Sequence, residues 1–489
     1  MVKFYITTPA YYPNNVPHLG HAYTTIITDA LARWYRLSLG DKNVLFISGL
    51  DEHGEKIETT ARDHKTQPQQ FVDEMANKFE KTWQLLNISY NNFIRTSDKR
   101  HIKVVYDVYK KINASGDIYK GFYEDWYCVP CESFWTENQL TNNRCPDCNR
   151  DVKKLKEESY FFKLSKYQDK LLQLYKDNPN FISPASRKQE IINRIEEGLR
   201  DLSISRKHVK WGIPIPGDEE FTIYCWIDAL SFYLSVLNYP QGHFKKFWPP
   251  DLQLMAKEIL WFHAVILPAL LMSAKIPLPK KIFAHGWLTV NGEKMSKSKG
   301  NFILPEEMVL KYGVDAFRYF LIREIPFGQD GDFSEDALKA RLNNELNNGL
   351  GNLVSRVLTL AEKHFKEVKK TTLDKSLADH FNLQNIEQLI NKLELHNALA
   401  EIWTFVHAVN RYINEKKPWE CKGEVLQKQL YTLLETLRIL SIILQPFIPS
   451  TAEKITQQLG IKPGTLKDCT FGKIATYKVK KGQNLFTKV

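Results

Sequence analysis

A histidine pair near the start of this 489-residue chain and a lysine-rich loop far downstream have the residue types that phosphate chemistry needs. His18-Leu19-Gly20-His21 follows a predicted strand and loop and opens a predicted helix. The two imidazoles share one face of the first turn, and Gly20 leaves room for a nucleotide against the backbone. The helix N-terminus adds free N–H groups and a positive dipole end. This arrangement stabilises charge on a phosphate under attack, although by itself it equally fits two structural histidines.

The lysine-rich loop covers residues 294–301 and reads Lys-Met-Ser-Lys-Ser-Lys-Gly-Asn, after a predicted strand and turn. Lys294 and Lys297 are three residues apart on a Ser/Gly-rich segment that can open and close. Two such cations suit a triphosphate, because they neutralise the charge of the leaving pyrophosphate. A solvated basic loop is the alternative, but its pairing with the histidine turn favours nucleotide chemistry.

Cysteine usage predicts a metal site. Four of the seven cysteines form two Cys-x-x-Cys pairs thirteen residues apart: Cys128, Cys131, Cys145 and Cys148. In an intracellular chain this spacing indicates metal binding rather than disulfides. Four thiolates close the tetrahedral shell of one zinc ion and leave no open position, so we predict one structural Zn²⁺ per chain.

Alternating strands and helices must position these motifs. A β-prone run at residues 4–8, a loop at 9–17, a helix beginning at Pro17 and a strand at 44–47 predict a parallel α/β sheet. Residues 116–220 interrupt the alternation and resemble an insertion with its own metal-stapled core. Strands resume at 221–226, 252–255 and 281–284, and long helices follow, at 389–414 and 425–444. The predicted units are therefore 1–115, 116–220, 221–335 and 336–489.

Composition and charge narrow the class of protein. Hydrophobic residues make up 43% and charged residues 25%, which excludes a disordered, collagen-like or disulfide-stapled chain. The longest apolar run, residues 259–274, contains His263 and Pro268 and predicts a buried helix rather than a bilayer span. The net charge is +11. Residues 346–489 contain 21 basic and 13 acidic residues, so this part of the chain carries +8 of that charge. A basic C-terminal part suits a nucleic-acid partner, and we expect a cytoplasmic protein that binds no membrane.

The two phosphate motifs resemble the signatures of class I aminoacyl-tRNA synthetases, and the segments between them are similar to methionyl-tRNA synthetases. The match runs in order over nearly the whole chain. The resembling segments are 8–13 (Thr-Pro-Ala-Tyr-Tyr-Pro), 49–54 (Gly-Leu-Asp-Glu-His-Gly), 224–229 (Tyr-Cys-Trp-Ile-Asp-Ala), 261–264 (Trp-Phe-His-Ala) and 285–288 (His-Gly-Trp-Leu). The family implies a Rossmann-like catalytic domain with an inserted zinc-binding connective domain, followed by an α-helical bundle that binds the anticodon.

The resemblance also implies roles for individual residues. His18, His21, Lys294 and Lys297 are the expected catalytic residues, and Gly20 and Ser298 join them in binding ATP. Asp51 is expected to hold the ammonium of methionine, and Tyr12 to close over it. The expected side-chain pocket consists of Ala10, Trp226, Ala229, Leu230, Tyr233, Ile259 and His263. Asn352, Arg356 and Trp419 are the expected anticodon-reading residues.

The implied activity is methionine–tRNA ligation through methionyl-adenylate, with ATP, L-methionine and tRNA(Met) as partners and Mg²⁺ accompanying the ATP. The chain ends without an appended oligonucleotide-binding barrel, through which longer relatives dimerise, so a monomer is expected. Two positions depart from the family pattern. Ala256-Lys257-Glu258 replaces the usual Gly-Lys-Asp, which affects the adenosine contacts, and Leu267 replaces a Trp before Pro268, which affects the pocket wall.

Three alternatives remain open on the residues alone. A synthetase for valine, isoleucine or leucine needs an editing insertion larger than the interruption allows, and a cysteine enzyme uses zinc to bind its substrate thiol. A zinc-ribbon RNA-binding protein with an inactive nucleotide site is disfavoured by the intact histidines and lysines. A nucleotidyltransferase without a tRNA step is disfavoured by the basic helical domain.

Overall fold

The centre of the computed structural model is a six-stranded, fully parallel sheet with strand order β3-β2-β1-β12-β13-β7. The structure describes residues 2–131, 133–135, 137–295 and 300–489. The predicted parallel α/β fold is thereby confirmed. The strands are β1 (Phe4–Tyr11), β2 (Val44–Leu50), β3 (Asn92–Arg95), β7 (Ile182–Ser183), β12 (Leu252–Ala256) and β13 (Ile282–His285).

Helices cover both faces of this sheet, because strands buried on two sides need apolar partners on each. α1 and α11 belong to a core that continues into the helical part of the chain, and α4, α7 and α9 belong to a second core. The helices of this half are α1 (Leu19–Leu39), α2 (Glu55–Asp63), α3 (Pro68–Leu85), α4 (Lys99–Ala114), α7 (Cys225–Ser235), α8 (Phe244–Phe247), α9 (Leu267–Ser273), α10 (Pro305–Tyr312) and α11 (Val314–Glu324).

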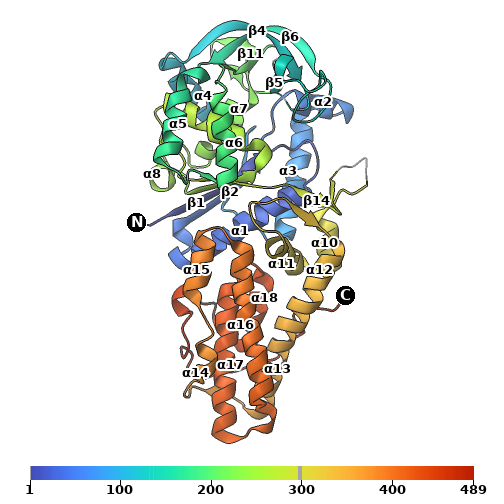
Figure 1. Cartoon of the computed structure of the whole chain (residues 1–489), viewed down its shortest axis with the longest axis vertical. Coiled ribbons are helices and arrows are strands. Elements are labelled where there is room, and N and C mark those ends of the chain that lie inside the picture. The colour runs from blue at the N-terminus through green and yellow to red at the C-terminus, as the bar shows by residue number, and fades with distance from the viewer. Residues whose placement is uncertain (1, 132, 136, 296–299) are drawn as a thin grey trace.

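Smaller antiparallel sheets lie above the central sheet at the top of Figure 1. One has the order β5-β4-β6-β8 and another the order β10-β11-β9. The elements are β4 (Ile118–Cys128), β5 (Ser133–Trp135), β6 (Lys153–Phe162), α5 (Gln168–Asp177), α6 (Ala185–Glu196), β8 (Leu202–Ser203), β9 (Ser205–Arg206), β10 (Pro214–Ile215) and β11 (Asp218–Ile223). A separate mixed sheet, β15-β14-β16, consists of β14 (Leu288–Val290), β15 (Glu293–Lys294) and β16 (Gly331–Phe333); β14 pairs antiparallel with β15 and parallel with β16.

The prediction of a parallel strand at residues 221–226 is wrong. β11 ends at Ile223 and pairs antiparallel with β9 and β10, and Trp226 lies in helix α7. The run is rich in β-prone residues, but packing against the second core makes its last part the first turn of a helix. Two of the six parallel strands, β3 and β7, were not predicted, and β7 comes from within the predicted insertion.

The apolar run at residues 259–274 forms a buried helix, as predicted, but with a widened π-helical turn at Phe262–Ile266. Proline in a helix clashes with the carbonyl four residues earlier, which for Pro268 is that of Ala264. The widened turn accommodates the ring, and the hydroxyl of Tyr175 donates to the Ala264 carbonyl. Leu267 is buried in this core.

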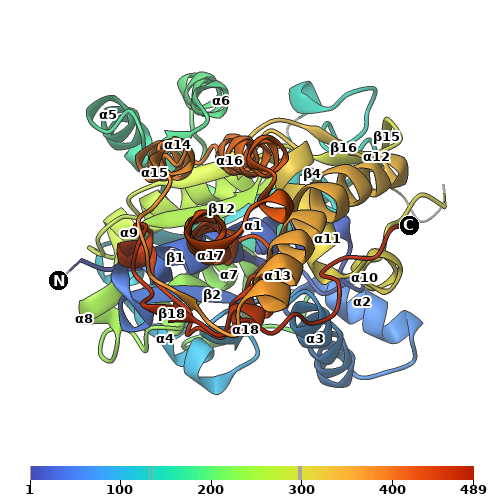
Figure 2. The same cartoon turned by 90° about the horizontal axis from the view of Figure 1, so that it is seen from below.

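The C-terminal part is a helical bundle in the lower half of Figure 1, and Figure 2 shows α17 in its centre. The predicted helix at 425–444 is confirmed as α17, whereas the one at 389–414 is divided by Leu393, which has φ +64°. The elements of the helical bundle are α12 (Glu335–Arg341), a π-helical segment (Leu342–Gly351), α13 (Asn352–His364), β17 (Val368–Lys369), α14 (Lys375–Ala378), α15 (Leu383–Asn391), α16 (Leu395–Lys416), α17 (Gly423–Leu444), α18 (Pro449–Leu459) and β18 (Thr476–Tyr477). Among the described residues, no helix has an apolar stretch that could cross a bilayer.

A buried arginine joins the sheet half to the bundle. Arg318 of α11 is fully buried and pairs with Asp29 of α1 at 2.7 Å. Its guanidinium also donates to the carbonyls of Leu86, Pro446 and Phe447 at 3.0–3.1 Å. The turn between α17 and α18 is therefore tied to the helix that carries the histidine pair.

Candidate active site

One large cleft, with a cavity volume of about 1110 Å³, lies beyond the carboxyl ends of β1, β2 and β12. This edge of a parallel sheet, where the strand order reverses, is the usual ligand site in such folds. The cleft brings together residues from both predicted sites: His18, Gly20 and His21 from the ATP site, and Ala10, Tyr12, Asp51, Trp226, Ala229, Leu230, Tyr233, Ile259 and His263 from the methionine site.

The histidine pair caps α1. The backbone N–H of Gly20 donates to Nδ1 of His18 at 3.0 Å, and the N–H of His18 donates to Nδ1 of His21 at 3.3 Å. The two rings stack with centroids 3.8 Å apart. Because both Nδ1 atoms accept hydrogen bonds, both neutral rings carry their proton on Nε2. Each ring thus keeps one N–H donor on the side opposite its capping bond.

The histidines of the cleft are neutral at physiological pH. Burial lowers the pKa of His18 to about 4 and places the pKa of His21 well below 6.5, with the neighbouring His18 adding to that effect. In this state the pair stabilises an anion through N–H donors and the helix end rather than through full positive charges.

His263 and Tyr233 form the inner wall of the cleft. Nδ1 of His263 lies 2.9 Å from the Ile259 carbonyl, so it is the protonated nitrogen, and Nε2 accepts from the Tyr233 hydroxyl at 2.7 Å. Burial lowers the pKa of His263 to about 4 and raises that of Tyr233, so both stay uncharged. Trp226 stacks on Phe262 with ring centroids 3.3 Å apart. The wall is therefore aromatic and uncharged.

Stability is expected to fall as the pH drops from about 6.5 to 4. The folded chain keeps His263 neutral down to a pKa of about 4, whereas the unfolded chain takes up that proton near 6.5. In this window the unfolded state binds more protons, so acid favours unfolding, by up to about 3 kcal/mol for this one group. Urea unfolding at several pH values would measure it. His263→Asn keeps a donor to Ile259 but does not titrate, so its decline should be shallower; an equal decline would contradict this assignment.

Part of the lysine-rich loop lies outside the described residues, including Lys297 and Ser298. Lys294 ends β15, whose partner strand is β14. Beyond the loop, the Phe302 ring lies edge-on to His18 with centroids 5.6 Å apart, and the Leu19 N–H donates to the Ile303 carbonyl at 3.2 Å. The far end of the loop is therefore anchored on the histidine turn.

The four predicted cysteines come together. Their Sγ atoms all lie within 4.8 Å of one another, with Cys128 3.5 Å from Cys148 and Cys131 3.9 Å from Cys145. A tetrahedral zinc with bonds of about 2.3 Å needs sulfurs about 3.8 Å apart, so the donor set fits that ion. Sequence reasoning missed that this cluster borders the cleft, which Pro130, Cys131, Pro146, Asp147 and Arg150 help to line.

Lys257, Glu258 and Trp287, which also line the cleft, belong to a polar cluster that the sequence did not assign. Lys257 pairs with Asp330 at 2.7 Å, and Asp330 accepts from the Trp287 backbone N–H at 2.8 Å. Glu258, one of the family departures, accepts from the Trp287 indole at 2.7 Å. Gly286 permits this packing, because a Cβ there would lie 2.3 Å from the Asp330 nitrogen. The His-Gly-Trp segment at residues 285–287 was the sequence signal that could have indicated this cluster.

The predicted anticodon residues lie far from the cleft, in the bundle. Asn352 and Arg356 are one turn apart on α13, and the Arg356 guanidinium lies 5.7 Å from the ring centre of Trp419. Arg356 also donates to Asn414 at 2.9 Å. Trp419 is 46% exposed, an unusual position for so large an apolar ring, so part of the ring is accessible from solvent.

Comparisons with known proteins agree with this architecture. The family model described as "tRNA synthetases class I (M)" matches residues 4–155 and 150–358, and the one described as "Anticodon-binding domain of tRNA ligase" matches 380–481. The methionine–tRNA ligases of Caldanaerobacter subterraneus subsp. tengcongensis and Thermotoga maritima are 48% and 44% identical to the chain. The first alignment covers 99% of this chain and 79% of the relative, and the second covers 96% and 77%.

Solved structures give the same result. Mycobacterium tuberculosis methionyl-tRNA synthetase in complex with methionyl-adenylate superposes with a TM-score of 0.94 at 37% identity, over 99% of this chain and all of that one. Its apo form superposes with a TM-score of 0.86 at 34% identity, over 100% of this chain and 98% of that one. The chain therefore belongs to the class I tRNA synthetase (M) family, the family of the methionine–tRNA ligases.

Proposed function

We propose that this protein is a methionine–tRNA ligase that works in two steps. In the first, a carboxylate oxygen of methionine attacks the α-phosphorus of ATP, and the bond from that phosphorus to the bridging oxygen of pyrophosphate breaks. In the second, the terminal hydroxyl of tRNA(Met) takes the methionyl group and AMP leaves. The observation that carries this proposal is one cleft that joins the histidine turn to the aromatic pocket.

The histidines act on the phosphate. His18 and His21 present Nε2–H donors beside the N-terminus of α1, where negative charge grows as the carboxylate attacks. Gly20 lets the nucleotide approach the backbone. Lys294, Lys297 and Ser298 hold the departing phosphates, and Mg²⁺ accompanies the ATP.

The other end of the cleft selects the amino acid. The carboxylate of Asp51 pairs with the substrate ammonium, and Tyr12 covers it. Trp226, Tyr233 and His263, together with Ala10, Ala229, Leu230 and Ile259, surround the thioether. An uncharged, aromatic-lined slot suits a long, polarizable side chain that makes sulfur–aromatic contacts.

The bundle is assigned to the tRNA anticodon. Asn352 and Arg356 offer an amide and a guanidinium to base edges, and Trp419 offers a stacking face. We further propose a cytoplasmic monomer with unit boundaries at 115/116, 220/221 and 335/336. Zinc on the four cysteines is structural, because thiolates fill its coordination shell.

Loss of the zinc is expected to impair the cleft as well as the cysteine cluster. Cys145→Ser removes a buried ligand, so we expect bound zinc to fall well below one per chain and thermal unfolding to begin at lower temperature. The KM for methionine should rise, because the cluster borders the cleft. Cys421→Ser, outside the cluster, is the matched control. Elemental analysis that finds one zinc per chain in the Cys145 variant would contradict the ligand assignment.

ATP–pyrophosphate exchange with each of the twenty amino acids tests the proposed function. Exchange that depends on methionine alone, followed by charging of tRNA(Met), is the expected result. Exchange with another amino acid would overturn the pocket assignment and keep the class. Absence of exchange in folded, zinc-loaded protein would favour an inactive RNA-binding protein.

A further inference from the structure

A buried carboxylate behind the methionine pocket has no part in the chemistry proposed above. Asp228 is fully buried in α7, and each of its oxygens meets a different histidine. Nδ1 of His53 lies 2.6 Å from Oδ2, and Nε2 of His101, from α4, lies 2.6 Å from Oδ1. Burial alone would raise the pKa of Asp228, but the two imidazoles hold it at about 2. An ionised carboxylate only accepts hydrogen bonds, so both ring nitrogens donate to it.

His53 belongs to a segment, residues 51–54, that is anchored at every position. The Asp51 N–H donates to the Tyr11 carbonyl at 2.9 Å, and the Glu52 N–H donates to the Thr96 hydroxyl at 2.9 Å. The carboxylate of Glu52 is buried and accepts from Arg95 at 2.7 Å. A segment held this closely transmits a displacement of one residue to the next.

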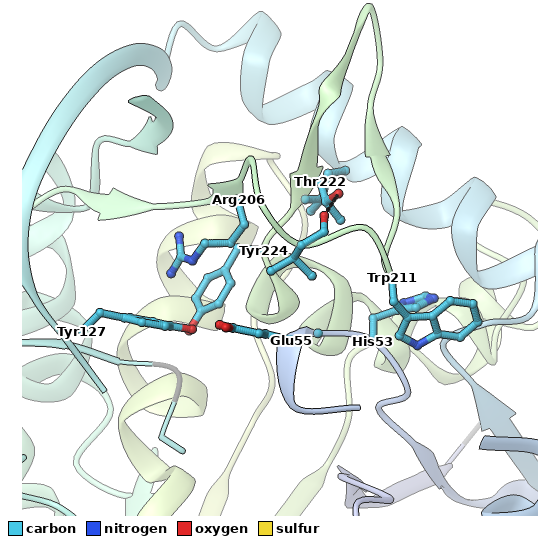
Figure 3. A pocket seen from close by; sticks show the side chains of 10 residues that line it. His53, Glu55, Tyr127, Arg206, Trp211, Thr222 and Tyr224 are labelled. Atoms are coloured by element: carbon cyan, nitrogen blue, oxygen red, sulfur yellow. Dashed lines mark hydrogen bonds between the residues drawn. The ribbon is translucent and has the colours of Figure 1, made fainter. Parts of the chain in front are cut away.

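Trp211 holds the same segment through separate contacts. Its indole N–H donates to the Glu52 carbonyl at 2.6 Å, and its own carbonyl accepts from the Gly54 N–H at 3.1 Å. The indole packs edge-on against the His53 ring, with centroids 5.4 Å apart. Figure 3 shows the two side chains next to each other. The imidazole therefore contacts both Trp211 and the carboxylate of Asp228.

Asp228 therefore connects the two ends of the cleft. On its own helix it lies between Trp226 and the residues Ala229, Leu230 and Tyr233, which line the side-chain end. Through His53 it holds the segment that carries Asp51, which lines the ammonium end. His101 ties the same carboxylate to α4, and its other nitrogen lies 2.8 Å from the Ser235 hydroxyl at the end of α7.

We infer that Asp228, acting through His53, is a positioning residue that sets the distance between the ammonium site and the thioether site. This inference rests on the proposed function. A fixed separation between these sites measures the length of the substrate side chain. Loosening it weakens methionine binding and reduces discrimination against homomethionine, which has one more methylene between Cα and the sulfur.

The test uses His53, because Asp228 without a side-chain carboxylate risks misfolding, whereas His53→Ala leaves the carboxylate paired with His101. We expect the KM for methionine in ATP–pyrophosphate exchange to rise about 10- to 100-fold, because a displaced Asp51 loses one charged hydrogen bond to the substrate ammonium. The kcat and the KM for ATP should stay near wild type, and the preference for methionine over homomethionine should shrink. His53→Asn places an amide N–H near the Nδ1 position and should recover most of both effects.

His64→Ala replaces an exposed histidine just after α2 and is the control for the general effect of a histidine-to-alanine change on the fold. An unchanged KM for methionine in His53→Ala would overturn the inference. A fall in kcat together with a rise in the KM for ATP would also overturn it, as would a His53→Asn variant as impaired as His53→Ala. Either result would indicate that His53 only contributes to the packing of the fold. Wild-type protein without methionine-dependent exchange would overturn the proposed function instead, so the two failures are distinguishable.

Discussion

Replacing His21 by Asn should lower the kcat of ATP–pyrophosphate exchange by about 10²- to 10³-fold, the usual effect of removing one donor that stabilises a developing anion. The asparagine oxygen can still accept the hydrogen bond from the backbone N–H of His18, which in the wild-type protein goes to Nδ1 of His21. What the variant lacks is the Nε2–H on the opposite side of the ring. The expected loss therefore reports the donor and not the helix cap.

Two further measurements isolate this effect. Methionine affinity by calorimetry should be unchanged, because His21 lies at the nucleotide end of the cleft. Alanine at His21 removes the cap as well and should add a loss of stability. If the His21→Asn variant lost methionine affinity to the same extent as kcat, the phosphate role would be wrong. Lys297→Ala should behave like His21→Asn in exchange.

Arg318→Met is expected to destabilise the protein by about 3–5 kcal/mol, the cost of breaking a buried ion pair from one side. Burial alone would raise the pKa of Asp29, but Arg33 and Arg318 hold it at about 2. Without Arg318, the negative charge of Asp29 is compensated only in part, by its ion pair with Arg33. The three carbonyls that accepted hydrogen bonds from the Arg318 guanidinium also lose their donor. Urea unfolding monitored by tryptophan fluorescence would measure the change.

An exposed pair serves as the control. Lys339 and Asp336 lie 3.3 Å apart on the surface of α12, and Lys339→Ala should leave the unfolding midpoint unchanged. Combining Arg318→Met with Asp29→Asn should recover part of the loss, since the uncompensated charge is then gone. A single Arg318 variant as stable as wild type would show that the pair contributes nothing.

The parts of the fold that the sequence predicted are those with a local signal. The β-prone run at residues 4–8 and the histidine turn marked β1 and α1 to within a few residues, and the apolar periodicity of 425–444 marked α17. β7 has only two residues, too few to show a pattern, and joins the sheet through pairing with β13. The break at Leu393 is a backbone conformation that the side chain does not announce.

The candidate site divides in the same way. The pocket residues were named from the resemblance, and the structure places them around one cleft. Asp228 lies in the resembling segment 224–229, but no role was predicted for it, although the sequence contains a signal that it is buried. A carboxylate within the apolar run 226–237 needs a buried partner, yet no rule of spacing indicates that the partners are His53 and His101. Such contacts between distant segments arise only from the packed fold.

The helix that passes from the sheet half into the bundle limits how this chain can change in length. α12, the π-helical segment and α13 run on without a break over residues 335–364. One inserted residue in an α-helix turns everything beyond it by about 100° and moves it by about 1.5 Å. A single insertion between α12 and Arg356 would rotate Arg356 away from Trp419, whereas surface loops absorb insertions freely. Codon-sized insertions and deletions should therefore be tolerated in the loops of this protein and eliminated from this helix.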